Sequence, residues 1–151
     1  MARNGLCGAI LAAGHGSIRP GIPKLLEPLN YGCTIIEAVV HLLDQELDIS
    51  RLAVAINHVH GKSLQGIISK SFSGVTYAHQ HERRGTADAA RLCVEALKQD
   101  YPPQEQFRNI VIVYGDMPLW RPESLAWLID GHSRYGATIS MFSIDISNLN
   151  G

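Results

Sequence analysis

The segment Leu6-Cys-Gly-Ala-Ile-Leu-Ala-Ala-Gly-His-Gly-Ser17 decides the fold of this chain. Its first part, Leu6–Leu11, is a short apolar run without polar alternation, which is typical of a strand buried on both faces. Its second part is rich in glycine, which allows the backbone to turn directly after the strand. A buried strand followed by such a loop favours a parallel sheet covered by helices.

The rest of the chain continues this alternation of buried strands and helical segments. No tight hairpin signal separates the apolar runs, so we predict an α/β fold of the three-layer α/β/α type with a Rossmann-like, mainly parallel sheet. Pro122 suits the first turn of the last helix. After the first strand, the predicted strands are Leu52–Ile56, Val75–Ala78, Ile110–Tyr114 and Ala137–Ile144, and the predicted helices are Cys33–Leu47, Lys62–Phe72, Thr86–Lys98 and the one opened by Pro122.

Length and composition indicate one globular domain over residues 1–151. The net charge of −1 leaves no global positive field for nucleic acid or an anionic membrane, so neither is expected as a partner. The run Leu6–Ala13 is too short to span a membrane. Three cysteines without a CxxC pair indicate free thiols, and hence a cytoplasmic protein. The oligomeric state is left open.

The glycine-rich loop is the first of three polar clusters that follow predicted strands. Gly14 and Gly16 allow a phosphate or ribose to approach the backbone, and successive backbone N–H groups in such a loop bind anions. Arg19 and Lys24 add positive charge, and Pro23 stiffens the approach to Lys24. The loop therefore predicts an anion site, with a tight turn beside two solvated cations as the alternative.

Two well-known phosphate motifs are excluded. A dinucleotide fingerprint requires a third glycine where Arg19 stands. Gly61-Lys62-Ser63 resembles the end of a P-loop, but Ile56 occupies the position of the first glycine. We interpret this tripeptide as the start of a helix.

The second cluster is Gln80-His-Glu-Arg-Arg-Gly-Thr86, between a strand and a helix. The amide of Gln80 can pair with the edge of a base, and Gly85 permits close backbone approach. Thr86 is a plausible N-cap. A capped helix without a ligand is the alternative.

The third cluster is Val113-Tyr-Gly-Asp-Met-Pro-Leu119, directly after a buried strand. Its carboxylate, Asp116, suits Mg²⁺, which takes one or two carboxylates together with phosphate oxygens and water. An aspartate that only caps the turn is the alternative.

The pairs His58/His60 and His79/His81 could each share a strand face, but no cysteine or carboxylate completes a zinc site, so we interpret them as polar strand-end residues.

The three clusters, in this order, resemble the sugar-1-phosphate nucleotidyltransferases, and most of all the N-acetylglucosamine-1-phosphate uridylyltransferase domains. Those domains carry L-A-A-G-x-G-T-R-M followed by P-K, then Q-x-x-x-L-G-T-x-x-A, then Y-G-D-x-P-L. The matching residues here are Leu11-Ala-Ala-Gly-His-Gly-Ser17 with Pro23-Lys24, then Gln80 with Gly85-Thr86 and Ala89, then Tyr114-Gly-Asp-Met-Pro-Leu119.

The resemblance implies transfer of a nucleoside monophosphate, with UMP from UTP expected, to a sugar 1-phosphate such as N-acetylglucosamine 1-phosphate, with release of pyrophosphate. It implies Mg²⁺ as cofactor, held by Asp116. The implied catalytic residues are Arg19, Lys24 and Asp116, the implied nucleotide-binding residues are Leu11, Ala12, Ala13, Gly14, Gly16, Lys24, Gln80, Gly85 and Thr86, and the implied substrate-binding residues are Tyr114 and Gly115.

The chain departs from the family pattern at three points. Arg19 stands one residue later than the family arginine, the stretch from Gly14 to Lys24 is about one residue shorter, and Arg84 replaces a leucine. The family's second metal ligand, an asparagine, falls beyond Gly151, so the resemblance implies a nucleotide-binding portion that is incomplete at its C-terminus. A relative of this fold that binds a nucleotide or a protein partner without catalysis is the alternative.

Overall fold

The computed structural model describes residues 5–30, 32–102 and 107–143. The chain divides into two compact units, Met1–Leu119 and Trp120–Gly151. All the predicted site residues belong to the first unit. Among the described residues, no helix has the length and apolar character needed to cross a membrane.

The first unit contains a parallel four-stranded sheet in the order β5-β4-β1-β6. Its strands are β1 (Leu6–Leu11), β4 (Leu52–Asn57), β5 (Val75–Gln80) and β6 (Asn109–Tyr114). The chain builds outward from β1 through β4 to β5 and then returns to the other side of β1. This reversal places a topological switch point between β1 and β6, where open α/β sheets bind ligands.

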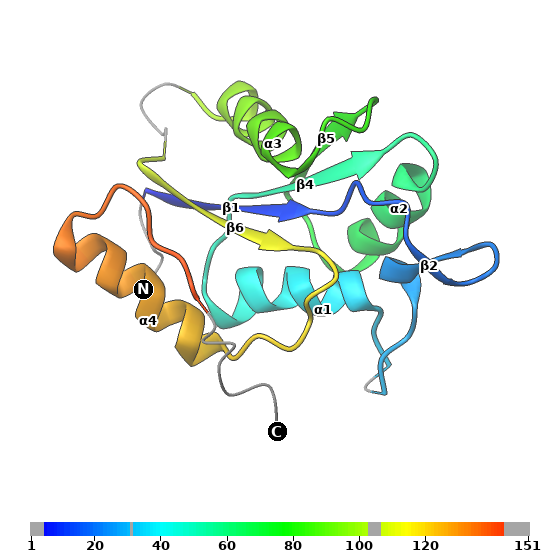
Figure 1. Ribbon diagram of the computed structural model, residues 1–151, viewed down its shortest axis with the longest axis horizontal. Coiled ribbons are helices and arrows are strands. Elements are labelled where there is room, and N and C mark those ends of the chain that lie inside the picture. Colours follow the sequence, from blue (N-terminus) through cyan, green and yellow to red (C-terminus); the bar gives the residue numbers. More distant parts are fainter. Residues whose placement is uncertain (1–4, 31, 103–106, 144–151) are drawn as a thin grey trace. The chain divides into compact units, whose positions relative to one another are not determined.

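Helices cover both faces of this sheet (Figure 1). Helix α3 (Thr86–Asp100) packs on one face, against β5, β4 and β1. Helices α1 (Ile35–His41) and α2 (Gly61–Ser71) lie on the other face, and α1 runs directly into a π-helical turn, η2 (Leu42–Glu46). The predicted three-layer α/β/α fold with a parallel sheet is confirmed.

Small side chains form the layer between the sheet and α3. The cluster joins alanines and cysteines of β1, β4 and β5 to one face of α3, and its members are Cys7, Ala9, Ala53, Ala55, Ala78, Ala89, Cys93 and Leu97. Cys7 and Cys93 are buried free thiols, as the sequence predicts, and burial raises the pKa of each to about 12. Neither thiol is therefore a nucleophile at neutral pH.

The loop after β1 leads into a short hairpin that the sequence does not reveal. Strand β2 (Ser17–Arg19) pairs antiparallel with β3 (Ile22–Pro23), and Gly21 turns between them with a φ of 79°. A single 3-10 turn, η1 (Lys24–Leu26), follows directly. Because Gly16 accepts the backbone N–H of Lys24 at 2.8 Å, the hairpin returns Lys24 to the glycine-rich loop.

The second unit contains α4 (Pro122–Tyr135), which begins with proline at its first turn as predicted. Gly136 ends this helix in the left-handed region, with a φ of 58°. The predicted strand Ala137–Ile144 is wrong for residues 137–143, which form no strand; Ile144 lies outside the described residues. This segment is engaged within its own unit instead, since Phe142 stacks on Trp120 and Ser140 hydrogen-bonds to His132.

Candidate functional site

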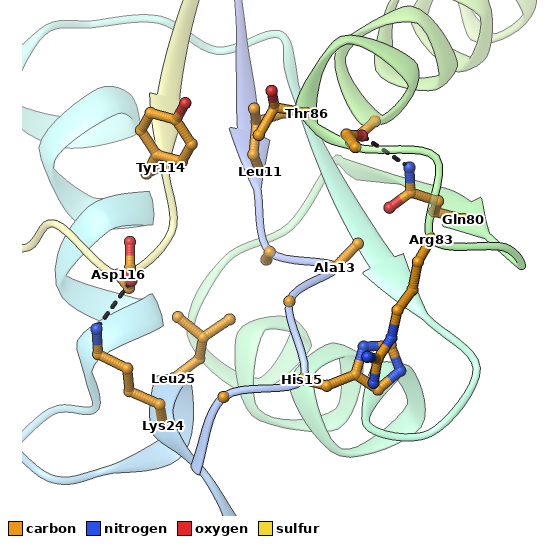
Figure 2. A pocket seen from close by; sticks show the side chains of 15 residues that line it. Leu11, Ala13, His15, Lys24, Leu25, Gln80, Arg83, Thr86, Tyr114 and Asp116 are labelled. Atoms are coloured by element: carbon orange, nitrogen blue, oxygen red, sulfur yellow. Dashed lines mark hydrogen bonds and ion pairs between the residues drawn. The ribbon is translucent and has the colours of Figure 1, made fainter. Parts of the chain in front are cut away.

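A cavity of about 570 Å³ lies where the carboxyl ends of β1, β5 and β6 meet. Parallel strands end at one edge of a sheet, so loops far apart in the sequence converge there. The wall is formed by Leu11, Ala12, Ala13, Gly14, His15, Gly16, Lys24, Leu25, Gln80, Arg83, Gly85, Thr86, Ala89, Tyr114 and Asp116. Residues from all three polar clusters of the sequence therefore surround one space (Figure 2).

The glycine-rich loop lies along the middle of this cavity. Neither Gly14 nor Gly16 has a positive φ, so conformational strain is not what requires glycine here. A Cβ atom on Gly14 would meet no atom within 4 Å, and one on Gly16 would only reach Lys24 at 4.0 Å. The two glycines thus leave the cavity side of the loop open, which suits the close approach of a ligand to the backbone.

Asn57, at the end of β4, holds this loop from behind. Its buried side chain donates to the carbonyl oxygens of Ala13 and Gly14, at 3.1 and 3.0 Å. Its amide oxygen accepts the backbone N–H groups of Val59 and His60, at 2.9 and 2.7 Å. One side chain therefore ties the loop after β1 to the turn after β4, and it engages the carbonyls of Ala13 and Gly14.

Lys24 and Asp116 form the ion-pair end of the cavity. Lys24 Nζ lies 2.8 Å from Asp116 Oδ2, and both side chains remain partly exposed, at 39% and 43%. The two residues are far apart in sequence, and the contact places η1 beside the turn after β6 (Figure 2). An exposed pair of this kind contributes at most about 1 kcal/mol, so a ligand can readily take either partner.

Arg19 lies elsewhere. Its guanidinium forms a fork with the carboxylate of Glu27, with Nε 3.0 Å from both carboxylate oxygens and Nη2 against Oε2, and it does not line the cavity. The hydrogen bonds from Arg19 lower the pKa of the buried Glu27. The structure thus brings Lys24 and Asp116 together and leaves Arg19 bound to Glu27, the residue directly after η1.

The opposite wall is the amide end, formed by Gln80, Gly85 and Thr86. Gln80 is only 9% exposed, and its amide nitrogen donates to Gly85 O at 3.0 Å and to Asp88 Oδ2 at 2.9 Å. Both acceptors fix the amide orientation, so its oxygen faces the loop that carries Ala13 (Figure 2).

Gly85, rather than Thr86, is the N-cap of α3, so that prediction is wrong. The N-cap position has a φ of 88°, which strongly favours glycine and places Thr86 as the first helical residue. No side chain among the described residues caps this end. The first backbone N–H groups of α3 thus begin at the cavity wall, where helix ends favour polar or anionic groups.

Tyr114 and Gly115 contribute differently. Tyr114 lines the cavity at the end of β6, whereas Gly115 is buried against β1 and donates its N–H to Leu11 O at 2.9 Å. A Cβ atom on Gly115 would lie 3.2 Å from both Ala12 Cβ and Leu11 O. Gly115 therefore permits the close approach that sets Asp116 beside the glycine-rich loop.

The described histidines form no metal site, since these parts of the chain hold no group of three His, Cys, Asp or Glu residues able to bind a metal. His15 nevertheless approaches His58 and His60, with ring centroids 6.2 Å apart in each case. Burial, then the charge of Arg83 and the two imidazoles, lowers the pKa of His15. His15 is thus more readily neutral than an isolated histidine, unless an anion binds beside it.

A Mg²⁺ ion fits this cavity by the chemistry of its donors. The carboxylate of Asp116 lines the cavity and is 43% exposed. Of its two oxygens, Oδ2 contacts Lys24. Mg²⁺ needs one or two protein carboxylates when phosphate oxygens and water complete its shell. Asp116 is the described residue that suits this role.

Sequence reasoning missed three residues that shape the site, namely Asn57, Glu27 and Asp88. Asn57 carried a signal, because a polar residue at the end of a fully apolar strand requires partners once it is buried. Glu27 and Asp88 carried none, since their partners become neighbours only in the folded chain. Sequence reasoning left Arg83 as a cation that either attracts an anion or is merely solvated and did not assign it to the site, yet it lines the cavity.

Comparisons with known proteins agree with this geometry. A family model described as the MobA-like NTP transferase domain matches residues 8–146. The bifunctional protein GlmU of Gloeobacter violaceus is 32% identical over 148 residues, which cover 97% of this chain and 30% of that protein. The chain thus spans less than a third of that curated relative's length.

Two solved structures share the fold. Rv0371c from Mycobacterium tuberculosis H37Rv has a TM-score of 0.62 and 25% identity, and the match covers 86% of this chain and 61% of that one. A 4-diphosphocytidyl-2C-methyl-D-erythritol synthase has a TM-score of 0.65 at 14% identity, with 100% and 68% covered, and so supports the fold alone. The resemblance carried by the three motifs is confirmed: this chain belongs to the MobA-like NTP transferase domain family.

Proposed function

We propose that this chain is the nucleotide-binding portion of a nucleotidyltransferase that transfers UMP from UTP to a sugar 1-phosphate such as N-acetylglucosamine 1-phosphate. The observation that carries the proposal is the single cavity that joins the glycine-rich loop, the amide of Gln80 and the Lys24–Asp116 pair. Membership of the NTP transferase family supports it.

Different residues along the cavity bind the base, the ribose and the phosphates of the nucleotide. Gln80, Gly85 and Thr86 contact the base, and Ala12, Ala13 and Gly14 lie against the ribose. The open loop at Gly14 and Gly16 offers backbone N–H groups to the phosphates, and Lys24 contributes a mobile positive charge. Leu11 and Tyr114 form the wall between the two ends.

The reaction forms a bond between a phosphate oxygen of the sugar 1-phosphate and the α-phosphorus of UTP. The bond from that phosphorus to the bridging oxygen breaks, and pyrophosphate leaves with the electron pair. Lys24, released from Asp116, neutralises charge that develops on the phosphates, and Asp116 would hold Mg²⁺. When bound, Mg²⁺ supplies charge neutralisation and alignment of the phosphate oxygens.

Calorimetric titration with UTP and Mg²⁺ tests binding, and a coupled assay for pyrophosphate from UTP and N-acetylglucosamine 1-phosphate tests turnover. We expect saturable binding of UTP, with pyrophosphate formed only when both substrates are present. No heat at millimolar UTP, with circular dichroism showing an intact fold, would exclude nucleotide binding.

A relative that binds nucleotide without catalysis is the second candidate. The pairing of Arg19 with Glu27, away from the cavity, favours it, because that cation is not available to the phosphates. Saturable binding of UTP without pyrophosphate release would support this candidate over the first.

A further inference from the structure

The orientation of the Gln80 amide depends on a residue that does not line the cavity. Each of the two hydrogens on Gln80 Nε2 has an acceptor, Gly85 O at 3.0 Å and Asp88 Oδ2 at 2.9 Å. Rotating the amide by half a turn would set its oxygen against both acceptors, at a site that is 9% exposed. Water cannot easily relieve that repulsion, so one orientation is fixed.

Asp88 is held as a pure acceptor. Its hydrogen bonds with Gln80 and then with Arg91 lower its pKa, so it is a carboxylate at neutral pH. Arg91 donates to Asp88 Oδ1 at 2.9 Å and also pairs with Glu95 at 2.6 Å, one turn further along α3. The Asp88 side chain is only 15% exposed. Three charged side chains on α3, Glu95, Arg91 and Asp88, are therefore linked in a row, and Asp88 connects that row to the amide of Gln80.

We propose that Asp88 is a positioning residue: it determines that the Gln80 amide presents its oxygen, a hydrogen-bond acceptor, to the base rather than its nitrogen, a donor. Asp88 engages Gln80 Nε2. Figure 2 shows Oε1 pointing toward the loop that carries Ala13, so the site offers an acceptor. A ligand edge with an N–H donor then fits, as the imide N–H of uracil or thymine does. The ring nitrogen at the same position of cytosine is an acceptor and is repelled.

This inference rests on the proposed nucleotide site but is narrower than it. Gly85 O favours the same orientation, but an asparagine at position 88 can donate as well as accept and so can offset that preference. With Asp88→Asn, the amide of residue 88 can pair with Oε1 of Gln80 and leave Nε2 toward the cavity. The site then accepts either polarity of base edge.

The test measures the affinities of UTP, CTP and 3-methyl-UTP for the full chain by calorimetry. We expect UTP to bind at least about tenfold more tightly than either analogue, since each analogue lacks the imide N–H. Asp88→Asn should bring the UTP-to-CTP ratio close to one. Arg91→Ala, which removes a partner but keeps the carboxylate, should leave the ratio within about threefold of the original.

Equal binding of UTP and 3-methyl-UTP to the unmodified chain would overturn the proposal, as would an unchanged UTP-to-CTP ratio in Asp88→Asn. A second readout needs no nucleotide. The side-chain amide protons of Gln80, followed by ¹⁵N NMR, should exchange slowly with solvent in the unmodified chain and at least about tenfold faster in Asp88→Asn. Protected amide protons without UTP binding would reject the proposed function and leave the fixed amide standing, whereas unprotected ones would reject the positioning role.

Discussion

The two ends of the cavity are built in opposite ways. At the amide end, Gln80 is buried and both of its amide hydrogens are used, at 2.9 and 3.0 Å. At the ion-pair end, Lys24 and Asp116 share one contact of 2.8 Å while each remains more than a third exposed. Folding alone fixes the first end, whereas solvent and ligands can rearrange the second at small cost.

This difference suits a site in which the buried amide end discriminates between ligands and the exposed ion-pair end adjusts to the bound ligand. Buried polar networks hold their geometry and discriminate between donors and acceptors, because an unmatched group there has no water to replace its partner. Exposed charges are free to move with the phosphates and a metal ion. The glycine-rich loop joins the two ends, and Asn57 fixes its position.

The largest effect is expected at the ion-pair end. Asp116→Asn should lower the rate of pyrophosphate release by about 10²–10³-fold, because the variant loses the carboxylate for Mg²⁺. It also frees Lys24, so the affinity for UTP without Mg²⁺ should rise. Paired titrations with and without Mg²⁺ measure this, and the thermal midpoint should hardly change. An undiminished response to Mg²⁺ would contradict the role of Asp116.

The connection between the two ends is tested at Asn57. Asn57→Ala should destabilise the chain by about 2–4 kcal/mol in urea unfolding, because two loop carbonyls and two backbone N–H groups lose their buried partner. Asn57→Asp is the matched control. It keeps the acceptor for Val59 and His60 but not the donor for Ala13 and Gly14, so it should still weaken UTP binding. UTP affinity unchanged in both variants would show that the loop does not need this support.

A smaller effect is expected from Arg83, which lines the cavity at its His15 side. Arg83→Ala should weaken UTP binding about three- to fivefold and reduce its dependence on salt, because an exposed cation adds long-range attraction to a triphosphate. Arg84→Ala is the control, since Arg84 pairs with Glu82 at 2.7 Å and does not line the cavity. An equal loss of UTP affinity in the two variants would indicate that the arginines act through long-range electrostatic attraction rather than through a local contact of Arg83.

The smallest effect concerns the hairpin that carries Lys24 to the cavity. Since Arg19 lowers the pKa of Glu27, this pair stabilises the fold above the ordinary glutamate pKa of about 4.3. That stabilisation is lost as pH falls through the lowered pKa. Glu27→Gln should therefore flatten the decline of the urea midpoint as the pH falls below about 4.5. Glu82→Gln, in an exposed pair, should follow the unmodified chain, and a parallel decline in Glu27→Gln would contradict the ionic role.

Local patterns predicted most of the fold. Leu6–Leu11 is β1 to the residue, and the other three strands and α3 agree with their predicted ranges to within two residues at either end. Apolar runs and helical spacing suffice there because burial repeats along the segment. The strand at Ala137–Ile144 failed over its described residues, since an apolar run signals burial but not which surface will cover it.

The site was predictable only in part. The three clusters could be found because glycine, amide and carboxylate at strand ends are visible in the sequence, and they line one cavity. Their partners were not visible: nothing local shows that Arg19 pairs with Glu27, or that Asp88 orients Gln80. Those pairings depend on β2, β3 and the packing of α3, which arise only with the tertiary fold.

The alanine-rich layer between the sheet and α3 limits which substitutions the core can take without moving the helix. Ala53, Ala55 and Ala78 set a thin spacing between sheet and helix, and the helix begins at the wall of the amide end. An added methyl group in that layer would lift α3, and with it Gly85 and Asp88, away from Gln80. In the proposed base site, the size of residues that do not contact the ligand would therefore influence the preference between bases, and a substitution in this layer could change it while every cavity residue stays the same.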